Sequence, residues 1–315
     1  ILMTVPIAWG TFEPAVRFVY KYQPQMPPLA FSFAYYLVAT SVLILFDTTT
    51  MLTTFNDNTS ANNNNWKKIP LSIRGGIELG TYLFIGNSLQ VIGLKTVPSD
   101  RAAFLLQLTT IFVPILKISL KTWIACFVAL TGVALIGLDN NNDGSSSYIS
   151  SNNDNVQLLQ HVPVFSIEDG YIVLGAISYT FHCIRLETYA KLLSPLQLAT
   201  AKAVTETIWS GVVVGSIVNN NNNNNGGGGG GEGWYTVGLA TLWTGSITVA
   251  YTIFAQSFGQ AVVPAVTANL IYTTQPFFTA IVAYLLLGER LGTYGYTGGI
   301  LIGVAVLFVV TTEEE

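Results

Sequence analysis

The chain has 315 residues, of which 50% are hydrophobic and 10% are charged, and its formal net charge is −4 at pH 7. Soluble domains carry charges at about a quarter of their positions, so this composition argues against a soluble protein. The lack of a basic patch argues against a nucleic-acid partner. Cys126 and Cys183 both lie in apolar runs, so we expect small core residues there and neither a disulfide nor a metal site.

A stretch without formal charge at residues 233–288 is the clearest single feature. Its 56 consecutive residues contain no Asp, Glu, Lys, Arg or His. A helix needs about 20 apolar residues to cross a bilayer, so the stretch is long enough for about two spans. The turn-forming residues 259–264 would separate them. We therefore expect a multi-pass integral membrane protein.

Ten apolar segments follow one another along the chain. They cover residues 2–20, 29–46, 73–97, 102–116, 118–138, 171–190, 196–218, 234–256, 261–287 and 294–310. Two polar stretches interrupt them, an Asn/Ser-rich linker at 139–165 and an Asn/Gly loop at 219–232. Neither composition can bury a core, so we expect both to be disordered. The prediction is an all-α membrane protein with ten transmembrane helices.

The linker divides the chain into two similar halves, 1–138 and 166–315. The fourth segment carries Pro114 and the ninth carries Pro276. Because each half has an odd number of spans, the halves should be two inverted five-helix repeats, an architecture of secondary transporters with the site at the repeat interface. The first repeat is shortened near 117–121, so its last helices should be short or tilted, unless the gene prediction has lost a segment.

Several spaced motifs point to a known family. In chain order they are Trp9-Gly10, Gly76-Ile-Glu78-Leu-Gly80, Gly86, Gln90, Arg101-Ala-Ala-Phe104, Pro114, Gln275-Pro276, Gly288-Glu289-Arg290 and Gly298-Gly299. With these motifs the chain resembles the EamA branch of the drug/metabolite transporter superfamily, over essentially its whole length outside the Asn and Gly tracts. The resemblance implies a carrier of amino acids, purines or other amphipathic metabolites, and does not choose among them.

Ionisable groups inside membrane spans are costly, so each one is a candidate for function. Glu13 lies in the middle of the first segment beside Pro14, which frees a backbone carbonyl, so its carboxylate could bind a proton or a cationic group. Alternatively, Arg17 neutralises it at the i, i+4 spacing. The same local pairing would account for Arg74 with Glu78, Glu187 with Lys191 and Lys202 with Glu206. For Arg185 we expect snorkelling to the interface in preference to contact with an anionic substrate.

Neutral polar side chains in apolar segments either bond between helices or line an aqueous cavity. As a set they favour a cavity, with Trp9, Tyr179 and Trp243 as its aromatic walls. His182 could carry protons, although a lone helical histidine is more often a packing residue. The predicted hinges are Pro14, Pro114 and Pro276, unless these are static kinks. The predicted substrate pathway comprises Trp9, Glu13, Glu78, Asn87, Gln90, Gln107, Tyr179, His182, Gln256, Asn269 and Gln275.

These features predict a secondary transporter that moves a small organic metabolite by alternating access. The sequence shows neither a catalytic constellation nor a phosphate-binding loop, so we expect no enzyme activity, no cofactor and no metal, and energy from exchange or from an ion or proton gradient. The expected partners are the substrate, the lipid bilayer and, at most, a second copy in a homodimer. The alternatives are a non-transporting receptor or assembly protein with the same fold, and an inactive remnant. The low-complexity tracts indicate a eukaryotic source, so the plasma membrane and a plastid envelope both stay open.

Overall fold

The computed structural model describes residues 1–60, 70–116, 166–221 and 233–288, and the isolated positions 127–128, 131–132, 135, 297–298, 300–301 and 303–304. Every regular element in these ranges is helical, which confirms the all-α class. The linker 139–165 and most of the segments 118–138 and 294–310 lie outside the described residues. The loop 219–232 was expected to be disordered, but its first three residues belong to helix α9, which ends at Asn221.

Each described helix overlaps a predicted segment, although α3 runs to Ser60, beyond the predicted end at residue 46. In the first half they are α1 (Thr4–Trp9), α2 (Phe12–Tyr22), α3 (Pro28–Ser60), α4 (Leu71–Gly93), α5 (Ser99–Leu106) and α6 (Thr109–Leu116). In the second half they are α8 (Ile167–Ala190), α9 (Pro195–Asn221), α10 (Gly233–Trp243), the π-helix η1 (Thr244–Tyr251), α11 (Thr252–Gly259), α12 (Ala265–Tyr272) and α13 (Gln275–Leu287).

Three of the predicted segments are broken into two helices each. The break between α1 and α2 at Gly10 follows from Pro14, which lacks the N–H that would bond the Gly10 carbonyl. Pro276 removes the corresponding bond to the Tyr272 carbonyl and so separates α12 from α13. Helix α5 in the first half and helix α12 in the second are each 8 residues long.

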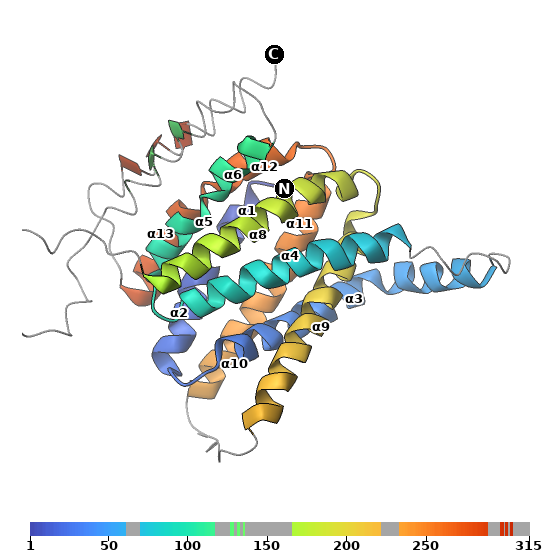
Figure 1. Cartoon of the computed structure of the whole chain (residues 1–315), viewed down its shortest axis with the longest axis horizontal. Coiled ribbons are helices and arrows are strands. Elements are labelled where there is room, and N and C mark those ends of the chain that lie inside the picture. Colours follow the sequence, from blue (N-terminus) through green and yellow to red (C-terminus); the bar gives the residue numbers. More distant parts are fainter. Residues whose placement is uncertain are drawn as a thin grey trace, which may run out of the picture.

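Long helices pack side by side to form the body of the molecule. Helices α4 and α8 lie alongside each other, and α9 packs against both α4 and α3 (Figure 1). Two glycines one turn apart allow α4 to approach α9 closely. A Cβ placed on Gly76 would lie 2.3 Å from the Cβ of Ala201, and one on Gly80 would lie 2.8 Å from the Lys202 carbonyl oxygen. Small residues at this spacing are typical of tightly packed membrane helices.

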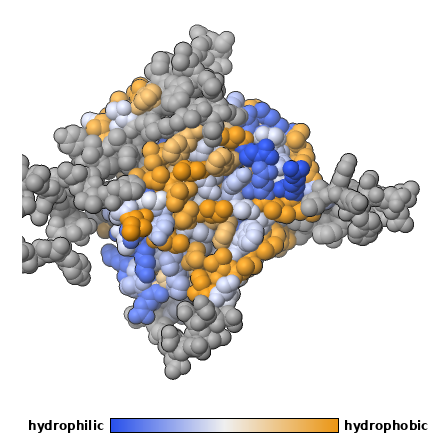
Figure 2. Space-filling model, viewed as in Figure 1, coloured by the Kyte–Doolittle hydropathy of each residue, from blue (hydrophilic) through white to orange (hydrophobic). Residues whose placement is uncertain are grey.

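The outer surface is strongly apolar. Figure 2 shows hydrophobic residues across the middle of the visible face, with hydrophilic residues gathered at its upper right and lower left. Leu45, Leu239 and Leu285 are each at least 70% exposed. Within the described ranges, three segments are long and apolar enough to cross a membrane, namely Pro28–Asp47, Trp234–Gly259 and Ala265–Leu287. A surface of this kind is suited to lipid and not to water.

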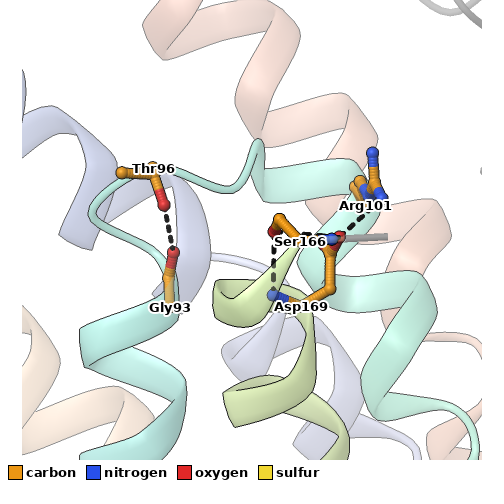
Figure 3. Close-up of polar contacts among 5 residues, drawn as sticks. All are labelled: Gly93, Thr96, Arg101, Ser166 and Asp169. Atoms are coloured by element: carbon orange, nitrogen blue, oxygen red, sulfur yellow. Dashed lines mark hydrogen bonds and ion pairs between the residues drawn. The ribbon is translucent and has the colours of Figure 1, made fainter. Parts of the chain in front are cut away.

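The start of α8 is fixed by a capping box and an ion pair (Figure 3). Asp169 Oδ2 accepts hydrogen bonds from the backbone N and the Oγ of Ser166 at 2.7 and 3.0 Å, and Ser166 Oγ accepts one from the Asp169 N–H. Arg101 of α5 donates to the same Oδ2 at 2.6 Å. The carboxylate of Asp169 therefore joins the first helix of the second half to the first half.

Asp169→Ala is expected to lower the stability of the folded protein. The change removes the carboxylate side of the capping box, where loss of a cap costs about 0.5–2 kcal/mol, and also removes the ion pair with Arg101. Thermal unfolding in detergent would show the loss as a lower Tm. Asp169→Asn keeps an acceptor for Ser166 but has no negative charge for Arg101, so its Tm should fall between those of Asp169→Ala and the parent. An unchanged Tm in Asp169→Ala would contradict this role.

Candidate functional site

A cavity of about 90 Å³ lies inside the helical body, with walls from both halves of the chain. Ten of the eleven residues in the predicted substrate pathway line it. They are Trp9, Glu13, Asn87, Gln90, Gln107, Tyr179, His182, Gln256, Asn269 and Gln275. Glu78 lies elsewhere. The polar residues of separate apolar segments therefore converge on one space. This arrangement is expected if they line a cavity, and it is not expected if they form unrelated hydrogen bonds between helices.

Glu13 is the acid at the centre of one wall, and it is fully buried. Its Oε1 accepts hydrogen bonds from Gln275 Nε2 at 2.6 Å and from Gln90 Nε2 at 3.1 Å. Its Oε2 has no partner with hydrogen-bonding geometry. Arg17 donates to the Val97 carbonyl instead, so the structure does not show the alternative in which Arg17 neutralises Glu13.

Tyr179 connects Glu13 to a second acid across the cavity. Its hydroxyl oxygen lies 2.6 Å from Asn87 Oδ1 and 2.7 Å from Gln90 Oε1. Asn87 in turn donates to Glu206 Oε1 at 3.3 Å. Gly86 leaves room for the tyrosine, because a Cβ there would lie 2.6 Å from the Tyr179 ring. The result is a continuous chain of polar contacts at hydrogen-bonding distance from one carboxyl group to the other.

Glu206 lines the cavity and was not among the predicted pathway residues. The sequence offered a signal, since a carboxylate lies within an apolar segment, but the i, i+4 spacing left neutralisation by Lys202 as an equal alternative. The structure shows no ion pair between them. Lys202 Nζ instead donates to Ser257 Oγ at 2.9 Å and to the Ile253 carbonyl at 3.5 Å. Both residues are fully buried, so each depends on partners from other helices.

Aromatic and weakly polar groups complete the walls. The rings of Trp9 and Tyr272 meet edge to face with centroids 5.1 Å apart. His182 is buried beside the cavity and its Nε2 has no hydrogen-bond partner, which differs from a satisfied packing residue. Trp243, predicted as a wall, does not line the cavity: it is half exposed and donates to Thr11 Oγ1.

Glu78 belongs to a separate cluster between α4 and α8. Arg185 Nε and Nη2 donate to its two carboxylate oxygens at 2.5 and 3.0 Å, and the Tyr189 hydroxyl donates to Oε2 at 2.6 Å. Arg185 therefore forms an ion pair with a neighbouring helix and does not snorkel, and Arg74 is not the bonded partner of Glu78. The predicted pair of Glu187 with Lys191 is confirmed at 3.0 Å.

The three predicted hinges lie in different settings. Pro14 and Pro276 each follow a helix break and lie in the first turn of the next helix, where a missing N–H is tolerated. Pro114 lies within α6. Pro14 directly follows Glu13, and Pro276 directly follows Gln275, so each of these two prolines lies beside a residue of the Glu13 hydrogen-bond cluster.

The π-helix η1 was not predicted from the sequence. It covers 8 residues in the middle of the apolar segment 234–259, and its Thr248 and Val249 line the cavity. A π-helix widens the turn and leaves backbone groups less regularly bonded, and such segments occur frequently at functional sites. Thr248 and Thr252 partly compensate by donating their hydroxyls back to the carbonyls one turn earlier.

Comparisons with known proteins define the class of the molecule. Residues 166–311 match the EamA-like transporter family. The match covers most of the second half of the chain and confirms the resemblance seen in the sequence. A comparison with curated proteins finds no match. One solved structure, described only as the crystal structure of a protein, aligns over 100% of this chain and 98% of its own length, with a TM-score of 0.64 and 12% identity. That likeness shows a shared fold alone.

Proposed function

We propose that the protein is a secondary transporter that moves a small organic metabolite across a membrane by alternating access. The observation that carries this proposal is the cavity, which is enclosed by both halves and lined by buried carboxyl and amide groups. A cavity that only reflects imperfect packing would have apolar walls. Polar walls inside an apolar body are instead expected of a site that exchanges water for a ligand.

The lining suggests the kind of solute. Four aromatic rings, from Trp9, Phe12, Tyr179 and Tyr272, offer flat apolar surfaces, and the amides of Asn87, Gln90, Gln107, Gln256, Asn269 and Gln275 offer both donors and acceptors. Several weak contacts of this type allow a ligand to leave as well as to bind. An amphipathic metabolite with a ring or a short hydrocarbon body and hydrogen-bonding edges fits these walls.

The ten-helix inverted repeat is part of the same proposal. The equal lengths of α5 and α12 before their breaks support two related halves. The contribution of both halves to one cavity supports a site at their interface. Rocking of one half against the other would then open the cavity to each side of the membrane in turn.

Counterflow in proteoliposomes tests this function. Vesicles would be loaded with an unlabelled metabolite from a panel of amino acids, purines and amphipathic cations, and uptake of the same labelled compound would be followed. The expected result is transient, saturable accumulation of at least one compound. Saturable binding without counterflow would indicate a receptor, and neither binding nor flux from monodisperse protein would indicate an inactive remnant.

A further inference from the structure

A phenol hydroxyl carries one hydrogen, yet Tyr179 has to satisfy two amide side chains. Its oxygen lies 2.6 Å from the Asn87 amide and 2.7 Å from the Gln90 amide. Two oxygens at such distances repel unless a hydrogen lies between them. Only one contact can use the hydrogen of Tyr179. The other amide must therefore turn over and present its NH₂ group, a change that needs no extra space because the two ends of an amide have nearly the same shape.

An amide that turns towards Tyr179 presents its oxygen to a carboxyl group. Gln90 lies 3.1 Å from Glu13 Oε1, and Asn87 lies 3.3 Å from Glu206 Oε1. Two oxygens facing each other at these positions need a hydrogen from the carboxyl group. Whichever amide is turned over therefore requires the acid form of its glutamate. If neither glutamate is protonated, one contact in the network stays unsatisfied.

With one proton, every contact in the network is a hydrogen bond, and two arrangements achieve this. In one, Glu13 is the acid and Gln90 is turned; in the other, Glu206 is the acid and Asn87 is turned. A second proton leaves one hydrogen without an acceptor. It either lies on the Oε2 of the second acid, which has no hydrogen-bond partner, or turns the second amide as well, so that both amides donate to Tyr179 and the hydroxyl hydrogen has no acceptor in the network. The count of donors and acceptors therefore favours a single proton for the two carboxyl groups together.

We propose that Glu13 and Glu206 hold one proton between them, and that Tyr179 is the positioning residue that makes the two acids a pair. This inference rests on the proposed function, because it names the second acid of the proton site of that carrier. A solute that donates or accepts one hydrogen bond at Tyr179 changes by one the number of hydrogens that the network needs. Its binding would therefore be linked to proton uptake or release.

Other ionisable groups surround the pair. Lys202 lies one turn before Glu206 on the same helix and directs its ammonium group to Ser257 and Ile253. The remaining titratable side chains that face the pair or its immediate partners are Tyr35 and Tyr36 from α3, His182 and Cys183 from α8, and Tyr272 from α12. None of them forms a hydrogen bond of normal geometry with either carboxyl group in the part of the chain that the structure describes.

Tyr179→Phe tests the proposal without any substrate. The protein would be reconstituted in lipid, and infrared difference spectra would follow the C=O band of protonated carboxylic acids against pH. Without the hydroxyl, Asn87 and Gln90 can both donate to carboxylates, so the proton is no longer needed to satisfy the network. The pH at which the acid band is half lost should therefore fall by about one to two units, a tenfold to hundredfold loss of proton affinity.

The direction of the change separates this mechanism from an ordinary lost hydrogen bond. Removing a donor that merely polarises the amides would leave the midpoint unchanged or raise it. Glu13→Gln and Glu206→Gln should each lower the midpoint of the acid that stays, because a glutamine can serve as either donor or acceptor. If the two acids were independent, the midpoint of Glu13 would be the same in Glu206→Gln as in the parent.

Tyr272→Phe is the matched control, since this tyrosine lines the same cavity and its hydroxyl lies outside the network. Its midpoint should equal that of the parent. An unchanged or raised midpoint in folded Tyr179→Phe protein overturns the shared proton and leaves the carrier proposal standing. A lowered midpoint in protein that shows no flux would support the shared proton and count against the carrier.

Discussion

Glu13→Gln is expected to abolish accumulation of substrate driven by a pH gradient while leaving counterflow in place. The glutamine keeps the shape of the side chain and its contacts with Gln90 and Gln275, but it cannot take up or release a proton. Because the glutamine can act as donor or acceptor, the remaining Glu206 no longer needs a proton to satisfy the network and stays ionised. A gradient of one pH unit supplies about 1.4 kcal/mol per proton, so a carrier coupled to one proton can accumulate its substrate about tenfold across it. In the variant this ratio should fall to one.

The measurement is the ratio of internal to external labelled substrate in proteoliposomes with an imposed pH gradient. Glu168→Gln provides the matched control, because this glutamate lies in the first turn of α8 and does not line the cavity. Its accumulation ratio should equal that of the parent. Persistent pH-driven accumulation in Glu13→Gln would assign proton coupling to another group.

Gly76→Ala is expected to destabilise the protein, and Gly76→Leu to prevent its folding. The missing side chain at Gly76 lets α4 lie directly on α9, where a Cβ would meet the backbone of Ala201 at 2.9 Å. Backbone atoms cannot move aside as a flexible side chain can, so the two helices must separate. Overpacking of this kind costs about 1–3 kcal/mol. The interface also carries Lys202 and Glu206, so the cavity should lose its shape as the helices part.

A glycine elsewhere on α9 isolates the effect of contact from that of helix propensity. Gly215 has nothing within 4 Å of an added Cβ, so Gly215→Ala should leave the Tm unchanged or raise it, as Gly→Ala usually does in a helix. Thermal unfolding and size-exclusion chromatography in detergent would compare the variants. A Gly76→Ala protein with the parent's Tm would show that α4 and α9 tolerate wider separation.

The membrane class and the helix positions could be predicted because both depend on local composition. Long apolar runs have one common solution in a bilayer, which is a helix with all its backbone bonds satisfied internally. By composition alone, three described segments qualify as spans. Helices α4, α8 and α9 are 23, 24 and 27 residues long, and each carries some of the polar or charged residues of the cavity, which lowers its apolarity without shortening it.

The convergence of the pathway residues could be expected, but their individual partners could not. Glu78 and Arg185 are 107 positions apart, and only the packing of α4 on α8 joins them. The nearer Arg74 looked the better partner because sequence spacing reveals neighbours along one helix and not across two. For the same reason Lys202 was considered as the partner of Glu206, whereas the hydrogen-bond partner of Glu206 is Asn87 from another helix. The π-helix η1 has no compositional signature at all.

Cysteine accessibility tests the central claim of a carrier most directly, since it needs no known substrate. The sequence contains two cysteines, and Cys183 lines the cavity, so Cys126→Ala leaves one reporter thiol. A membrane-impermeant thiol reagent would be applied to right-side-out and to inside-out vesicles of this variant. Cys183 is expected to react from both sides of the membrane, because the cavity opens to each side in turn. Reaction from one side only, or from neither, would contradict alternating access through this cavity.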